Sequence, residues 1–134
     1  MHLTLEADYA VRIVHCLACA QGRRVDAKTI SEKTGVTLRF SLKIMRKLVA
    51  GGIVRSYKGT HGGYELAREL EDLTLYDVIE IVEGPYSISR CVSPDFECTH
   101  VENGRAGCLF HGIYHDISEM VQQRLKEIKF SQLV

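Results

Sequence analysis

The sequence has no apolar run that approaches the roughly 20 residues needed to cross a bilayer. Its first residues also lack the charged start, long apolar stretch and small-residue cleavage site of a secretory signal. These absences argue against a membrane protein, and we expect the chain to act in the cytoplasm. The 134 residues contain no internal repeat and no low-complexity segment, and they can form one compact domain or a small domain with an appendage.

The usual features of an enzyme are missing as well. No nucleophile stands beside a base, and there is no phosphate-binding loop of the kind found in nucleotide-binding enzymes. A chain of this length also has little room for a deep pocket. We therefore expect neither catalysis nor a small-molecule substrate.

Five cysteines are present, an odd number that argues against a fully paired disulfide framework and favours reduced thiols. Three of them, Cys91, Cys98 and Cys108, share one irregular segment with His111. Three thiols and an imidazole are the ligand types of an iron-sulfur or metal site, and such a site can act as a sensor. The alternatives are a closed zinc site and sensing by thiol oxidation without any metal.

The absence of net charge hides a strong asymmetry along the chain. Residues 23–68 carry eleven Lys or Arg against three acids, a net charge of +8, whereas residues 69–134 carry a net charge of −7. A basic block beside an acidic block indicates one face that meets a polyanion. A small electron-transfer protein that carries a cluster would explain the cysteines but not the basic block, so we rank that function lower.

The basic block follows the pattern of a helix-turn-helix. Residues 5–20 are apolar on nearly all sides, which predicts a helix buried against several neighbours. Asp26 can cap a second helix that runs through Lys33 and ends at Gly35, and Thr37 can cap a third helix. A short helix, a tight turn and a helix with a basic outer face predict a DNA-binding helix-turn-helix.

The third helix is predicted to have one apolar face and one basic face. Its core positions recur at helical spacing and are Leu38, Leu42, Met45 and Leu48 or Val49. The opposite face presents Arg39, Ser41, Lys43, Arg46 and Lys47. The residues that we predict to lie in the major groove of DNA are Thr37, Arg39, Ser41 and Lys43. Those that we predict to lie near phosphates are Lys47 and Arg55.

After the third helix the apolar pattern changes to a period of two. Residues 53–57 and 64–67 are therefore predicted strands, joined by the glycine-rich residues 58–63. A hairpin directly behind a recognition helix is a wing, and its glycines let the backbone approach a phosphate or enter a minor groove. We place Lys58 and His61 at the tip of this wing.

The last third of the sequence is predicted to form a short helix, a loop and a long helix. Thr74 opens the short helix with the pattern of a capping box, and Gly84 ends it. From residue 110 to about 129, one apolar stripe is formed by Ile113, Ile117, Met120 or Val121, Leu125 and Ile128. A domain of this size has little left to cover such a stripe, so we predict a homodimer formed through the long helix.

These elements predict a mostly helical fold with one small β-hairpin. Residues 1–84 are assigned to a winged helix-turn-helix DNA-binding domain and residues 85–109 to a cysteine-containing cluster-binding loop. Residues 110–134 are assigned to a dimerisation helix and a C-terminal tail. Two such units on a dimer should read a palindromic operator in double-stranded DNA, with half-site centres roughly 34 Å or a multiple of it apart.

Several short motifs run through nearly the whole chain. They are Leu3-Thr4, Asp8-Tyr9-Ala10-Val11-Arg12, Ile30-Ser31-Glu32, the wing from Lys58 to Tyr64 and the closing Leu133-Val134. Together and in this order they resemble the bacterial family of winged-helix iron-sulfur regulators that includes IscR, NsrR and RirA. The resemblance implies a homodimeric transcription factor controlled by a cluster that senses iron, redox or nitric oxide status, and we expect a repressor.

The resemblance also implies a set of cluster ligands. Cys91, Cys98 and Cys108 fall where the family places its three cysteines, and Cys108-Leu-Phe-His111 resembles the motif that completes a 2Fe-2S site in the IscR branch. Asp8 occupies the position that the NsrR branch uses to bind a 4Fe-4S cluster across the dimer. We favour a 2Fe-2S cluster with His111 as its fourth ligand and keep a 4Fe-4S cluster with Asp8 as the alternative.

Three further side chains of ligand type are not predicted to bind. Cys16 and Cys19 lie on the first helix, which is expected to be buried, and should pack as small apolar residues. His115 lies one helical turn beyond His111 and is not expected to be a ligand.

Overall fold

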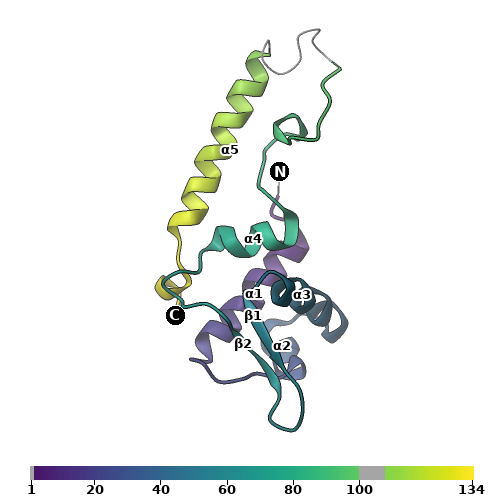
Figure 1. The fold of residues 1–134 in the computed structure, drawn as a ribbon, viewed down its shortest axis with the longest axis vertical. Helices are drawn as coiled ribbons and strands as arrows, with labels where there is room; N and C mark the ends of the chain where they lie inside the picture. The colour runs from purple at the N-terminus through teal and green to yellow at the C-terminus, as the bar shows by residue number, and fades with distance from the viewer. Residues whose placement is uncertain (1, 100–107) are drawn as a thin grey trace.

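The computed structural model describes residues 2–99 and 108–134, and it has the predicted fold, mostly helical with one β-hairpin (Figure 1). In chain order, the elements that position the site are α1 (Leu5–Cys19), α2 (Ala27–Thr34), α3 (Leu38–Ala50), β1 (Val54–Tyr57), β2 (Gly63–Leu66), α4 (Leu75–Glu83), the 3-10 turn η1 (Arg90–Val92), α5 (Leu109–Glu127) and the 3-10 turn η3 (Phe130–Gln132). Over the described ranges, no helix is both long and apolar enough to span a membrane.

The helix ends are fixed by local hydrogen bonds that the sequence predicts. The Asp26 carboxylate accepts from the Thr29 amide at 2.8 Å, and the Thr37 hydroxyl accepts from the Phe40 amide at 3.3 Å. Thr74 and Asp77 form a reciprocal capping box at the start of α4. Gly35 ends α2 with φ of +73°, a conformation that favours glycine. The turn between α2 and α3 therefore has the tight geometry of a helix-turn-helix.

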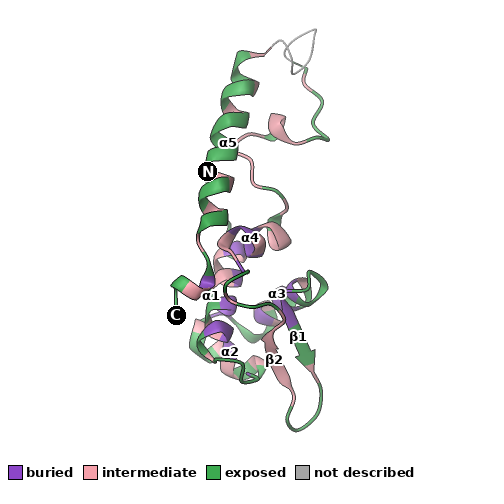
Figure 2. Cartoon of the chain, turned by 60° about the vertical axis from the view of Figure 1, so that its left-hand side comes forward, coloured by how far each residue is buried: buried purple, intermediate pink, exposed green. Residues whose placement is uncertain are grey.

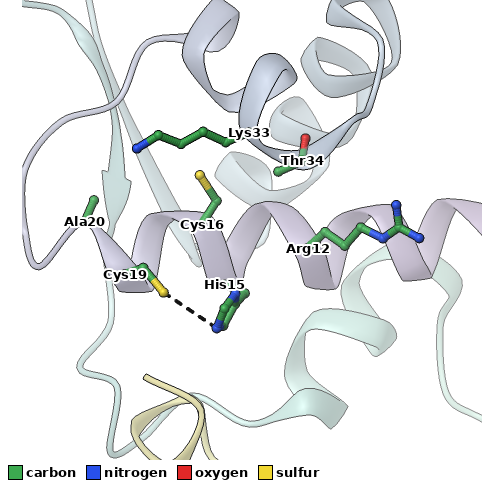
Figure 3. A pocket seen from close by; sticks show the side chains of 7 residues that line it. All are labelled: Arg12, His15, Cys16, Cys19, Ala20, Lys33 and Thr34. Carbon is green, nitrogen blue, oxygen red and sulfur yellow. Dashed lines mark hydrogen bonds between the residues drawn. The ribbon is translucent and has the colours of Figure 1, made fainter.

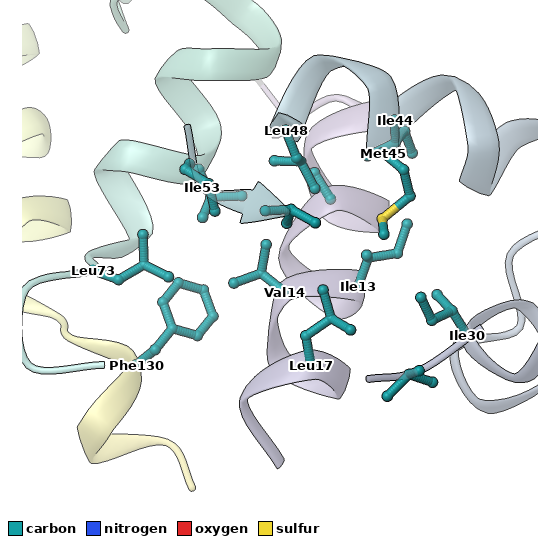
Figure 4. Close-up of a cluster of buried hydrophobic side chains, with 14 residues drawn as sticks. Ile13, Val14, Leu17, Ile30, Ile44, Met45, Leu48, Ile53, Leu73 and Phe130 are labelled. Carbon is teal, nitrogen blue, oxygen red and sulfur yellow. The ribbon is translucent and has the colours of Figure 1, made fainter. Parts of the chain in front are cut away.

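The hydrophobic core gathers around α1, whose inward side chains meet α2, α3, β1 and the C-terminal tail (Figure 4). From α3 the buried positions are Ser41, Ile44, Met45 and Leu48. The prediction that Leu38 faces the core is wrong, because its side chain is 45% exposed, whereas of the predicted alternatives Leu48 and Val49 it is Leu48 that is buried. The buried arc of α3 is centred on Ile44 and Leu48 instead, which turns Leu38 toward solvent.

The predicted wing is a two-stranded antiparallel hairpin in which Val54 pairs with Leu66 and Tyr57 with Gly63. A bridge between Val25 and Tyr64 adds a third short segment, with backbone hydrogen bonds of 2.9 and 2.8 Å. A Cβ at Gly63, where φ is +142°, would lie 2.9 Å from the Val25 carbonyl oxygen. Glycine at this position therefore lets the wing pack against the loop between α1 and α2.

The C-terminal tail, which follows α5, returns to the winged-helix core. Phe130 is fully buried, and its ring lies beside Leu73 (Figure 4). Its amide donates to the Leu73 carbonyl at 2.9 Å, and the Leu75 amide donates to the Ile128 carbonyl at 3.0 Å. An aromatic side chain gains free energy by leaving water, and the core offers the nearest apolar surface. The tail is thus part of the DNA-binding domain in space.

The long helix α5 extends beyond the winged-helix body (Figures 1 and 2). Its inner side meets the segment that follows α4. There the backbone amide of Ile88 donates to the Ser118 hydroxyl at 2.9 Å, and the side-chain amide of Gln122 donates to the Tyr86 carbonyl at 2.6 Å. The single stripe of the prediction divides into two faces. The half-buried inner face contains Val121, Leu125 and Ile128. The exposed apolar face consists of Leu109, Phe110, Ile113, Ile117 and Met120.

We predict that Phe130→Ala lowers the free energy of unfolding by about 3–5 kcal/mol, because it leaves a cavity in the core and frees the end of α5. Thermal or denaturant unfolding followed by circular dichroism measures the change. Leu133→Ala is the matched control in the same tail, since its side chain is 41% exposed. Equal stability of the two variants would show that the tail does not anchor α5.

Candidate DNA-binding surface and cysteine segment

The start of α3 presents an exposed polar and basic surface. Thr37, Arg39 and Lys43 are all exposed, and the Lys43 ammonium lies 5.4 Å from the centre of the Phe40 ring. Phe40 in turn packs edge-on against Tyr9 of α1, with ring centroids 5.5 Å apart. These contacts hold the Phe40 ring in place on α3, while the exposed charged groups of Arg39 and Lys43 remain free to reach a ligand.

Ser41 does not belong to this surface, and the prediction that it lies in the major groove is wrong. The residue is 0% exposed, and its hydroxyl donates to the Val36 carbonyl at 3.4 Å. A hydroxyl that is buried must find a hydrogen-bond partner, and the turn before α3 supplies one. Ser41 therefore fixes α3 against the turn and cannot touch a base.

Lys47, at the other end of α3, is held by acidic groups. Its ammonium lies 2.7 Å from a Glu6 carboxylate oxygen in an ion pair that is only partly exposed. Glu83, at the end of α4, lies close by, since burial and the charge of Glu6 raise its pKa while Lys47 opposes the shift. Lys47 thus joins α3 to the ends of α1 and α4. Arg55 is exposed on β1, as expected of a residue that meets phosphate.

The wing carries exposed Lys58 and His61 at its tip. A residue that the sequence did not single out packs against the tip end of the hairpin. The guanidinium of Arg24 lies 3.5 Å from the centre of the Tyr57 ring and donates to the His61 carbonyl at 3.4 Å. Tyr57 also donates its hydroxyl hydrogen to Glu65 at 2.6 Å. Arg24 lies in a loop without periodicity and meets Tyr57 only in the folded chain, so the pattern of apolar residues could not reveal it.

The cysteine segment begins directly after α4 and its described part includes all three predicted thiol ligands. Cys91 lies in η1, where its sulfur is 3.2 Å from the Ser89 hydroxyl oxygen. Cys91, Cys98 and Cys108 are all half-buried free thiols. Residues 100–107, which belong to the predicted cluster-binding loop, lie outside the described residues.

His111 lies in the first turn of α5, and the described residues offer no hydrogen-bond partner to its buried Nδ1. Two ligand atoms of one tetrahedral zinc ion are about 3.8 Å apart when both are thiolates. No three of Cys91, Cys98, Cys108 and His111 bring their donor atoms within 4.8 Å of one another, judged over the described residues. The four side chains have the donor chemistry of a cluster site, but they do not form a compact tetrahedral set.

Asp8, the alternative fourth ligand, is already engaged in an ion pair. Its carboxylate lies 2.8 Å from the Arg12 guanidinium, one turn along α1. Both side chains are partly exposed, so the pair is weak and a competing ligand could displace Arg12.

Comparison with known proteins identifies the family. The model of the Rrf2 family, described as iron-dependent transcriptional regulators, matches residues 3–134. The chain belongs to the Rrf2 family. It is therefore a DNA-binding transcriptional regulator and not an enzyme, as the sequence predicted.

Individual Rrf2 relatives agree with this assignment. The chain is similar to the HTH-type transcriptional regulator IscR of Vibrio atlanticus, at 30% identity over 135 residues that cover 100% of this chain and 75% of that protein. It is equally similar to IscR of Xenorhabdus nematophila, at 30% identity over 100% of this chain and 79% of that protein.

Solved structures of regulators show the same fold. IscR of T. potens has a TM-score of 0.76 at 23% identity, covering 99% of this chain and 85% of that chain. CymR of B. subtilis, described as the global cysteine regulator, has a TM-score of 0.75 at 22% identity, covering 99% of this chain and 95% of that chain.

The remaining two cysteines of this Rrf2 protein line a shallow pocket between α1 and α2 (Figure 3). Cys16 is half-buried, and burial raises the pKa of its thiol although the Lys33 charge partly opposes the shift. Cys19 is exposed, which differs from the prediction of a packed side chain, and its sulfur lies 3.6 Å from Nε2 of His15. The two thiols point in different directions, so they do not form a pair (Figure 3).

Proposed function

We propose that this Rrf2 protein is a homodimeric repressor whose operator binding is controlled by an iron-sulfur cluster in the cysteine segment. The observation that carries the proposal is the set of three free thiols in the cysteine segment together with an unpartnered imidazole nitrogen in the first turn of α5. The cluster supplies an iron centre that iron shortage, oxidation or nitric oxide can alter. We expect such a regulator to act in the cytoplasm.

The ligands that we propose are Cys91, Cys98, Cys108 and His111. Three thiolates and one weaker nitrogen ligand suit a cluster that has one labile corner open to iron loss, oxidation or nitric oxide. His111 has a free buried nitrogen, whereas Asp8 is paired with Arg12. We therefore favour a 2Fe-2S cluster with His111 over a 4Fe-4S cluster with Asp8.

Thiol oxidation without a cluster is the second candidate. The same free thiols support it, and the sulfur of Cys91 lies 3.2 Å from the hydroxyl oxygen of Ser89. A cysteine-only sensor gives no role to His111, whose unpartnered nitrogen is the reason for ranking the cluster first.

For the DNA contact, we propose that the start of α3 enters the major groove with Thr37, Arg39 and Lys43. The wing tip, with Lys58 and His61, then lies along the adjacent minor groove or its phosphates. Arg55 on β1 lies near the backbone of the DNA. Lys47 contacts phosphate only if its ion pair with Glu6 opens, because the 2.7 Å contact occupies its ammonium.

We propose a second copy of this chain as the partner of the exposed apolar face of α5. Ile113, Ile117 and Met120 recur at intervals of four and three, which is the spacing of a helix that packs on another helix. These side chains are 52%, 37% and 72% exposed, and burying them against an identical helix would remove a large apolar surface from water. The resulting dimer would present two α3 helices to a palindromic operator.

A continuous set of contacts connects the cysteine segment to α3. The segment leaves the C-terminal end of α4 and leads into α5, while the end of α5 is bonded back to the start of α4 through Leu75 and Ile128. In turn α4 packs closely on the end of α3, since a Cβ at Gly51 would collide with Ile81. A change in the cysteine segment therefore acts on α4, and through it on the position of α3.

We predict that Lys58→Ala weakens binding of duplex DNA and lowers the slope of log affinity against log salt by about 1, because one phosphate contact is lost. A mobility-shift titration at several salt concentrations measures both. Lys129→Ala removes an equal charge far from the wing and is the control. An unchanged affinity and slope for Lys58→Ala would mean that the wing does not contact DNA.

We predict that protein purified without air is coloured and contains iron and acid-labile sulfide, and that Cys91→Ser loses both. His111→Ala should lose the cluster as well, whereas Asp8→Ala should retain it. Visible absorption with iron and sulfide analysis makes the measurement. A colourless protein without iron, or one with bound zinc in its place, would falsify the cluster proposal.

A further inference from the structure

A second group of ligand-type side chains lies on α5, one turn beyond His111. His115, Asp116 and Glu119 each offer one donor atom, and the three atoms lie within 4.8 Å of one another. A ring nitrogen of His115, Nε2, is 3.8 Å from a Glu119 carboxylate oxygen. The other ring nitrogen, Nδ1, is 3.7 Å from an Asp116 carboxylate oxygen. All three side chains are exposed, so an ion from solvent can reach them.

These separations are those of neighbouring ligands rather than of hydrogen bonds. A charge-assisted hydrogen bond between nitrogen and a carboxylate oxygen is about 2.7–2.9 Å long. Two nitrogen or oxygen ligands of one tetrahedral zinc ion are about 3.4 Å apart, because each lies about 2.0–2.2 Å from the metal. An ion between the imidazole and a carboxylate would therefore need only a small adjustment of the side chains.

His111 lies one helical turn before this group, with its donor atoms outside the 4.8 Å set. Its ring centroid is 6.4 Å from that of His115, on the next turn of the same helix face. Its Nδ1 is buried, and the part of the chain that the structure describes gives it no hydrogen-bond partner. Two histidines four residues apart on a helix are a recurrent zinc-binding arrangement.

We propose that α5 carries a site for a divalent transition-metal ion of the zinc class, with one ring nitrogen of His115 and the carboxylates of Asp116 and Glu119 as ligands. His111 lies outside this 4.8 Å group and becomes an additional ligand only when its side chain turns toward His115. Imidazole combined with carboxylate suits zinc and the neighbouring first-row ions, whereas magnesium and calcium prefer oxygen ligands alone. Ligands from one exposed helix leave coordination positions open to water, so the affinity is modest. The site is open to exchange with the surrounding solution.

The proposed site stays accessible in a dimer. His111, His115 and Glu119 follow one another at intervals of four, on the side of α5 that faces away from Ile113 and Ile117. A second copy packed on the exposed apolar face therefore leaves the histidine face uncovered. His115 and Glu119 therefore stay accessible in the dimer, whereas Asp116, three residues after Ile113 and four before Met120, borders the dimer face.

One consequence rests on the proposed function. His111 is both the proposed fourth cluster ligand and a ligand of this site, and one imidazole cannot serve two metal centres through the same nitrogen. A divalent ion that draws His111 toward His115 removes the weakest ligand of the cluster. The site would thus make the cluster sensitive to the level of free divalent metal.

The test is a calorimetric titration of ZnCl₂ into the full chain with Cys91, Cys98 and Cys108 replaced by serine, so that no thiolate of the cysteine segment competes. We expect one ion per chain and a loss of affinity of about tenfold or more in His115→Ala on this background. Gln123→Ala, on the same helix, should bind as the background does. Circular dichroism of each variant shows that the helix is intact.

Absence of zinc binding in the serine background, or equal binding by the background and by His115→Ala, would overturn the proposal. If the serine background does not fold, a second measurement replaces the titration. Cobalt(II) spectra are recorded for the cluster-free chain with its cysteines in place, with and without His115→Ala. A cobalt signal that does not change with His115→Ala also contradicts the site. Because neither measurement involves iron or sulfide, failure here leaves the cluster proposal unaffected, and the reverse is equally true.

Discussion

The burial of Phe130 in the winged-helix core is the contact on which the arrangement of this molecule depends. The ring is fully buried beside Leu73, and backbone hydrogen bonds on either side of it join the tail to residues 70–75. This anchor fixes one end of α5 to the start of α4. Without it, α5 would keep its contacts with residues 86–92 and with α4, where the Lys126 ammonium lies 4.7 Å from the centre of the Tyr76 ring, but its C-terminal end would lose its attachment to the core.

With the anchor in place, α4 is joined to α5 at both ends. The tail fixes the start of α4, and the cysteine segment connects the end of α4 to the start of α5. Any change in the path of the cysteine segment must therefore move α4 or α5. Since Gly51 and Ile81 leave no free space between α3 and α4, movement of α4 reaches α3, the proposed recognition helix, directly. Ligand chemistry in a loop can thus be converted into a change at the DNA surface.

The sequence was most informative where structure is local. The caps at Asp26, Thr37 and Thr74 depend on residues three positions away, so their patterns are readable along the chain. The burial of Ser41 and the return of Phe130 depend on contacts that only the folded chain makes. For the cysteine segment, residue types and order indicated a cluster site, but they did not give the distances between the thiols, which depend on the path of the loop.

The most direct test of this account is amide hydrogen exchange of the protein with and without its cluster, compared segment by segment. The account predicts that cluster loss changes exchange in the cysteine segment, in residues 70–75 and 128–131, and at the end of α3 near Gly51. Changes confined to residues 88–111, with identical exchange at the tail junction and α3, would contradict it. In that outcome the cysteine segment would not be mechanically connected to the DNA-binding surface.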